Sequence, residues 1–167
     1  MIRPIDRQIV DLLMEDGRMP CAEIARRLGD VSERTVRYRL DRLLARGVIR
    51  VAAIPNPKVL GYEVIADVFI HVEPAAILDV ARRMAEFEQV SYVSCSMGES
   101  DISVQVVGRD NAEVYAFVTD VVARTPGVRK TTTLIVPVIL KDVHQWRIPA
   151  DARRIGRRAA DAARTGE

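Results

Sequence analysis

The first fifty residues carry three short hydrophobic stripes at the spacing of an α-helix. The residues of the three stripes are Ile5, Ile9, Leu12 and Leu13; Ile24, Ala25 and Leu28; and Val36, Leu40, Leu43 and Leu44. Glycines at positions 17, 29 and 47 follow the stripes, Pro20 suits the first turn of the second helix, and Ser32 is a predicted N-cap of the third. Three short helices with a tight turn between the second and third predict a helix-turn-helix over residues 1–50.

The exposed side of the predicted third helix is rich in groups that bind nucleic acids. Opposite its hydrophobic stripe and at its start lie the candidate DNA-contacting residues, Ser32, Arg34, Thr35, Arg37, Tyr38, Arg39 and Arg42. Guanidinium groups fit guanine edges and phosphates, and hydroxyl groups add hydrogen bonds in the groove or to the backbone. We expect Arg34, Tyr38 and Arg42 to contact DNA, with Arg37 and Arg39 mostly on phosphates. The alternative interpretation is a solvated, arginine-rich helix face.

Beyond residue 60 the hydrophobic period changes to that of strands alternating with helices. Residues 51–60, with Pro55-Asn56-Pro57, are a predicted extended linker. Four strands are predicted at 62–72, 90–97, 102–107 and 131–141, and two helices at 77–84 and 114–122. The order β-α-β-β-α-β predicts a ferredoxin-like domain over residues 61–146, so the fold class is α+β. Ile65 and Phe69 fall on the sheet face without helices, which favours dimerisation through the sheets.

Charge and composition narrow the class of protein. The net charge of +2 divides into +4 for residues 1–60, −5 for 61–145 and +3 for 146–167. The net positive charge of residues 1–60 fits a polyanionic partner such as double-stranded DNA. Cys21 and Cys95 lie too far apart for a metal motif and suit a reducing compartment. Because the N-terminus lacks a signal-like apolar run and the stretch 134–140 is too short to span a bilayer, we expect a cytoplasmic protein without a membrane partner.

Recognisable catalytic and metal-binding motifs are missing from the sequence. The only histidines, His71 and His144, neighbour no second ligand or paired carboxylates. No P-loop, GxSxG or HExxH pattern occurs. We therefore expect no enzyme activity, no catalytic residues, no cofactor and no metal site.

Both halves of the chain contain a series of short motifs in a characteristic order. In the first half they are Ile5-Asp6-Arg7-Gln8-Ile9, Glu15-Asp16-Gly17-Arg18, Glu23-Ile24-Ala25, Arg39-Leu40-x-Arg42-Leu43 and Gly47-Val48-Ile49. In the second half they are Leu60-Gly61-Tyr62, Gly98-x-x-Asp101 and Thr125-Pro126-Gly127-Val128. From about residue 4 to Trp146, the chain resembles the Lrp/AsnC family of feast/famine regulators. The resemblance implies a helix-turn-helix that binds DNA as a dimer and a βαββαβ sensor that forms dimers, often octamers, and binds an amino acid between subunits.

The resemblance also implies a candidate effector site. The family's turn between the second and third sensor strands falls on Gly98, Glu99, Ser100 and Asp101. Its backbone N–H groups can hold a carboxylate, and Asp101 or Glu99 can meet an ammonium group. Thr131, Thr132 and Thr133 are candidate contacts to the ligand from a second subunit. The alternatives are an ordinary hairpin turn and β-branched residues that merely suit a strand.

The sequence therefore predicts a sequence-specific DNA-binding transcriptional regulator, modulated by an amino acid or similar small effector and working as a homodimer or a higher homo-oligomer. One alternative is a chromatin-like protein that organises DNA without a ligand. The other is an enzyme similar to the siroheme decarboxylases, which share this fold. Residues 147–167 form a basic C-terminal tail that we expect to be a solvated end.

Overall fold

A computed structural model describes residues 2–149 of the chain, which fold as two compact units. The first unit contains residues 2–53 together with 141–149, and the second contains residues 54–140. Residues 141–146, which the sequence assigned to the sensor domain, group with the first unit. The arginines of the predicted basic tail, from Arg153 onward, lie outside the described residues.

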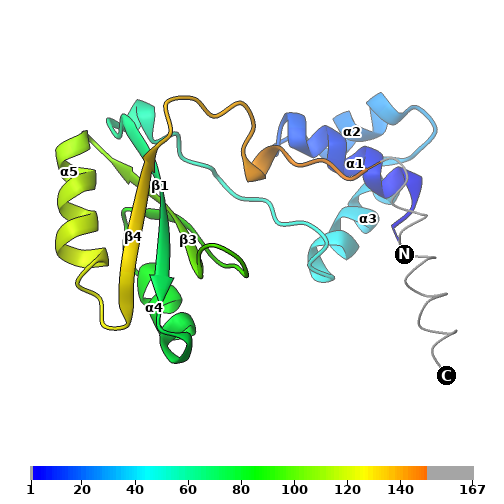
Figure 1. The fold of residues 1–167 in the computed structure, drawn as a ribbon. Coiled ribbons are helices and arrows are strands. Elements are labelled where there is room, and N and C mark those ends of the chain that lie inside the picture. The colour runs from blue at the N-terminus through cyan, green and yellow to red at the C-terminus, as the bar shows by residue number, and fades with distance from the viewer. Residues whose placement is uncertain (1, 150–167) are drawn as a thin grey trace, which may run out of the picture. The chain divides into compact units, whose positions relative to one another are not determined.

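The first unit is built on three helices, α1 (Pro4–Glu15), α2 (Cys21–Leu28) and α3 (Glu33–Ala45), labelled in Figure 1. Ile9, Met19, Ile24 and Val36 form its buried core, so the three predicted stripes do meet. Leu44 is the exception, because it is 41% exposed. The helix-turn-helix prediction is confirmed, although Pro20 is the N-cap of α2 rather than a residue of its first turn.

The second unit has the predicted βαββαβ order. Its elements are η1 (Lys58–Leu60), β1 (Val64–Val72), η2 (Pro74–Ala76), α4 (Ile77–Met84), β2 (Val90–Cys95), β3 (Ile102–Gly108), α5 (Asn111–Ala116), the π-helical segment η3 (Phe117–Val122) and β4 (Val128–Ile135). A further 3-10 turn, η4 (Val143–Gln145), belongs to the first unit. The four strands form one antiparallel sheet in the order β2-β3-β1-β4 (Figure 1). The ferredoxin-like fold class is confirmed.

The two faces of this sheet differ in what covers them. On one face, alternate side chains of β1 and β3 pack against α4, α5 and η3 in a core formed by Ala66, Val68, Ile70, Val72, Val80, Ala81, Met84, Ile102, Val104, Val106, Val114, Phe117, Val118 and Val122. The intervening β1 residues point to the other side, which we call the open face. Ile65 and Phe69 lie there, as predicted, opposite Val107 and Ser103 of β3.

The structure corrects the bounds of three strands. The first predicted strand begins at Val64 rather than at residue 62, and the second ends at Cys95 rather than at residue 97. The last strand was predicted over residues 131–141, whereas β4 spans Val128–Ile135. Val136 still donates its N–H to the carbonyl oxygen of Ile65, 2.8 Å away. The pairing ends there because Pro137 has no N–H to donate and because the partner strand β1 begins at Val64.

Candidate functional site

The exposed side of α3 presents the side chains that the sequence predicts to contact DNA. Its start is capped by Ser32, whose Oγ accepts from the N–H of Thr35 (3.2 Å) and lies 3.0 Å from the hydroxyl of Thr35. Tyr38 is 60% exposed, and the guanidinium of Arg42 lies 5.7 Å from the centroid of its ring. Arg42 Nη1 also donates to the hydroxyl oxygen of Tyr38 at 3.3 Å. The structure therefore brings Tyr38 and Arg42 together through a cation–π contact and a hydrogen bond.

The four arginines of α3 differ in their ionic partners. Arg37 Nη2 lies 2.6 Å from Glu33 Oε1, one helical turn away, and this hydrogen bond raises the pKa of the Arg37 guanidinium. Arg34 and Arg42 have no carboxylate oxygen within 4.0 Å among residues 2–149. We call Arg34, Tyr38 and Arg42 the recognition face of α3. Its two guanidinium groups remain available for an anionic partner.

Arg39 lies in a different environment from the one predicted. Its Nη1 is 2.9 Å from Asp6 Oδ1 on α1, and the two side chains are only 20% and 11% exposed. The second oxygen of Asp6 accepts from the backbone N–H of Arg3 at 2.7 Å. The pair thus joins α3 to the start of α1 and gives Arg39 a structural contact, while its phosphate contact stays a prediction. Sequence reasoning missed the role of Asp6 as the partner of Arg39. The available signal was that Asp6 is a polar residue inside a hydrophobic stripe.

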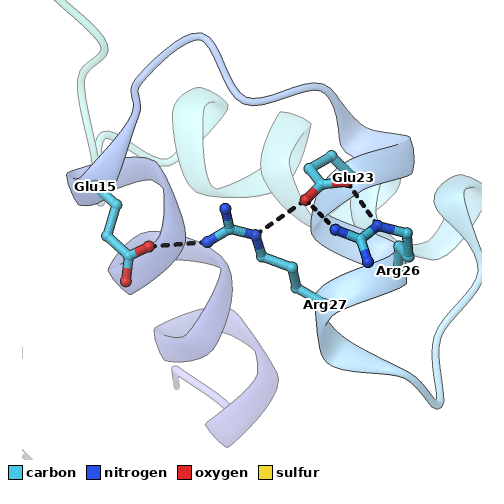
Figure 2. A network of polar contacts seen from close by, with 4 residues as sticks. All are labelled: Glu15, Glu23, Arg26 and Arg27. Carbon is cyan, nitrogen blue, oxygen red and sulfur yellow. Dashed lines mark hydrogen bonds and ion pairs between the residues drawn. The ribbon is translucent and has the colours of Figure 1, made fainter.

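A second network of charges ties α2 to α1 (Figure 2). Glu23 accepts from Arg26 Nε and Nη2 at 2.8 and 2.7 Å and from Arg27 Nε at 3.0 Å. Arg27 Nη1 reaches across to Glu15 Oε2 of α1, also at 3.0 Å. The hydrogen bonds from Arg26 and Arg27 lower the pKa of Glu23 from 4.5 to about 2. The carboxylate form of Glu23 is therefore favoured by the folded arrangement.

Acid should weaken the first unit through this carboxyl group. Because the folded state depresses the pKa of Glu23, its contribution to stability is present above pH 4.5 and is lost as the pH falls through 4.5 towards 2. We expect the Glu23 carboxyl resonance to titrate near pH 2 in an NMR experiment on the wild type. In the variant Arg26→Gln/Arg27→Gln the midpoint should move up towards 4.5. A wild-type midpoint already at 4.5 would contradict the network.

The turn between β2 and β3 contains the predicted effector residues. Asp101 anchors it, because Asp101 Oδ2 accepts from Val72 N (2.8 Å) and the N–H of Asp101 donates to the carbonyl oxygen of Ile70 (3.1 Å). Ser96 Oγ donates to the carbonyl oxygen of Ser100 at 2.7 Å. The N–H groups of residues 97–100 have no hydrogen-bond acceptor among the described residues. These free donors can hold a carboxylate.

The side chains of this turn are not all available to a ligand. Glu99 is exposed, whereas the carboxylate of Asp101 is already engaged with the backbone of β1. Gly98 has a positive φ of 147°, and a Cβ at this position would meet open space. A side chain at Gly98 would therefore strain the backbone without disturbing its neighbours.

The threonines of β4 are separated by the alternation of the strand. Thr131 is paired with Ile70 on the helix-covered side, Thr132 with Phe69 on the open face, and Thr133 with Val68. The backbone of Asp101 also bonds to Ile70, so Thr131 and the turn lie at the same end of the sheet. A ligand on the open face would meet Thr132 but neither neighbouring threonine.

Other chemistry has little support in the part of the chain that the structure describes. No group of three or more His, Cys, Asp and Glu side chains there is arranged to hold a metal ion. Within residues 2–149, no helix has the length and apolar character needed to span a membrane.

Comparison with known proteins gives concordant results for both units. A model of the AsnC-type helix-turn-helix domain matches residues 4–44, and a model of the Lrp/AsnC ligand binding domain matches residues 65–145. An uncharacterised HTH-type transcriptional regulator of Pyrococcus abyssi is 42% identical over 138 residues, which cover 82% of this chain and 87% of that protein. Among solved structures, Escherichia coli AsnC aligns with a TM-score of 0.78 at 26% identity, over 86% of this chain and 99% of AsnC. A Neisseria meningitidis regulator in complex with L-methionine aligns with a TM-score of 0.83 at 22% identity, over 92% and 99% of the two chains.

Proposed function

The chain belongs to the Lrp/AsnC family of DNA-binding transcriptional regulators, and we propose that it reads its operator through the recognition face of α3 and responds to an α-amino acid bound at the turn 98–101. The observation that carries the DNA proposal is the pattern of ion pairing on α3. Arg34 and Arg42 are exposed and lack carboxylate partners among the described residues. Since the DNA of prokaryotes such as Pyrococcus abyssi lies in the cytoplasm, we propose that the protein works there.

Removing Arg42 should weaken specific DNA binding. Arg42 is already oriented by the ring of Tyr38, so little conformational freedom is lost when it docks on a base edge. If it makes a bidentate contact to guanine, we expect Arg42→Ala to cost about 1–3 kcal/mol of binding free energy. The measurement is a fluorescence titration of a duplex selected by the wild type from a random DNA pool. Arg124→Ala, which removes an exposed guanidinium from the second unit, is the matched control and should bind normally.

Two outcomes of this titration would point elsewhere. Unchanged affinity in both Arg42→Ala and Arg34→Ala would mean that another surface binds the DNA. A wild type that binds scrambled and selected duplexes equally well would favour a DNA-organising protein over a regulator of specific operators.

The open face of the second unit supports a proposal of self-association. Ile65, Phe69 and Val107 place apolar groups on a face of the sheet that the helices of the unit do not cover, where Ile65 is 9% exposed and Phe69 and Val107 are half-buried. Such a face is stabilised when a second copy of the chain covers it. We propose a homodimer formed through this face, from which higher homo-oligomers are built. An effector bound at the turn 98–101, next to this face, would then act by changing how the subunits associate.

The free N–H groups of Gly98, Glu99 and Ser100 support an α-amino acid as the effector. They suit its carboxylate, Glu99 is the exposed carboxylate for its ammonium group, and Ser100 and Thr132 are proposed to complete the site. The relative from Neisseria meningitidis, which was solved with L-methionine, is consistent with this class of ligand. Asp101 then contributes mainly by holding the turn against β1.

A thermal-shift screen of the twenty amino acids should find the effector. A ligand present at a hundred times its Kd stabilises the folded state by about 2.7 kcal/mol, which is a readily measured rise in Tm. With the amino acid so identified, calorimetry should show weaker binding by Glu99→Gln. Asp101→Asn should have a smaller effect, because the amide oxygen can still accept from the N–H of Val72. A larger loss in Asp101→Asn than in Glu99→Gln would assign the ammonium contact to Asp101.

A further inference from the structure

We propose that Glu33 is a specificity-determining residue, which accepts a hydrogen bond from the amino group of a cytosine in the major groove and also restrains the non-specific attraction of Arg37 for phosphates. The proposal rests on the proposed function, because it assumes that α3 enters the groove. It concerns a residue that lies outside the recognition face. Glu33 is the first residue of α3, directly after the N-cap Ser32.

The Glu33–Arg37 ion pair is not needed to hold the fold together. Its two side chains are 48% and 66% exposed, in contrast to the largely buried pair of Arg39 with Asp6. Exposed pairs of this kind contribute little to stability because solvent screens them. The 2.6 Å contact therefore has its main consequence on the surface, where it cancels a guanidinium charge next to the recognition face.

The position of the carboxylate selects which arginine is neutralised. Glu33 is paired with Arg37, whereas its immediate neighbour Arg34 has no carboxylate partner among residues 2–149. Phosphate contacts by free arginines strengthen binding to every sequence, since the backbone carries no sequence information. Pairing Arg37 with Glu33 thus lowers sequence-independent affinity while Arg34 remains available for a base edge.

The same carboxylate has a specific partner in the major groove. Among base edges, the amino group of cytosine is the donor that suits a glutamate or aspartate side chain. At a matched site Glu33 gains this hydrogen bond, while next to guanine or thymine it meets only acceptors and the negative field of the phosphates. The carboxylate therefore penalises incorrect sequences more than the correct one. The 2.6 Å hydrogen bond from Arg37 fixes the orientation of the Glu33 carboxylate.

The test compares the wild type with Glu33→Met, which keeps an unbranched side chain of similar length and removes both the charge and the acceptor oxygens. We measure the affinity for a duplex selected by the wild type and for a scrambled duplex, each over a range of salt concentrations. For Glu33→Met we expect the ratio of the two affinities to fall about tenfold, as for the loss of one base contact. We also expect the salt dependence to steepen by about one phosphate contact as Arg37 is released. DNA selected afresh by the variant should lose its preference for cytosine at one position.

Two further variants make the result decisive. Asp79→Asn removes an equal charge from an exposed pair with Arg82 on α4 and should change neither the ratio nor the salt dependence. In an Arg37→Ala background, Glu33→Met should still lose the cytosine preference but should no longer steepen the salt dependence. An unchanged ratio and an unchanged selected sequence in Glu33→Met, while Arg42→Ala weakens binding, would overturn the role of Glu33 and leave the proposed function intact. Normal binding by Arg42→Ala would instead count against the recognition face itself.

Discussion

Replacing Phe69 by arginine should convert the proposed dimer to a monomer. Phe69 lies at the centre of the open face, between Ser103 of β3 and Thr132 of β4, and its side chain points away from the helix-covered core. A hot-spot residue near the centre of an interface contributes at least about 2 kcal/mol, and we expect Phe69 to be such a residue. In a two-fold symmetric dimer the substitution occurs twice, so we expect a loss of about 4 kcal/mol, or roughly a thousandfold in the dissociation constant.

Light scattering and sedimentation at micromolar concentrations measure this effect directly. Tyr115→Arg is the matched control, because Tyr115 is 71% exposed on α5, on the opposite side of the sheet. It should leave the dimer intact. Circular dichroism checks that Phe69→Arg remains folded, as expected for a residue outside the core. A wild type found only as an 18.7 kDa species, or a Phe69→Arg variant that is still dimeric, would exclude the open face as the interface.

Replacing Asp6 by alanine should destabilise the DNA-binding unit more than any exposed charge substitution in it. The change leaves Arg39 largely buried without its anion and removes the acceptor of the Arg3 N–H at the start of α1. Breaking a buried pair costs several kcal/mol because the remaining charge is uncompensated. Since this pair is slightly exposed, we expect a loss of about 2–4 kcal/mol in the free energy of unfolding. Chemical denaturation followed by helix signals of the first unit measures it.

Two variants separate this structural role from a role in DNA binding. Asp41→Ala removes an exposed carboxylate from α3 and should change stability by no more than about 0.5 kcal/mol. Arg39→Met keeps the aliphatic volume and should retain the salt dependence of DNA binding wherever the protein is folded. If Arg39→Met flattened the salt dependence by about one phosphate contact, the phosphate role first predicted for Arg39 would be restored.

Most of the fold was accessible from local patterns along the chain. The helical period of Ile5 to Leu13, the N-cap at Ser32 and the alternation of Val64 to Val72 each depend on neighbours within a few residues. Strand ends were less predictable. β4 ends at Ile135 because Pro137 lacks an N–H and because its partner β1 begins at Val64. The start of β1 is about seventy residues away in the sequence, so the pattern around β4 alone does not reveal where the pairing stops.

The candidate sites show the same division between local and distant information. The pairing of Glu33 with Arg37 at i,i+4 was visible in the sequence, because side chains one helical turn apart are neighbours. The sequence determined by itself that an arginine-rich helix and a Gly98-to-Asp101 turn exist, since both are local. Only the tertiary structure decided which of their charged groups are free. The partner of Arg39 is 33 residues away and that of Asp101 is 29, and contacts at such separations form only when packing brings the elements together.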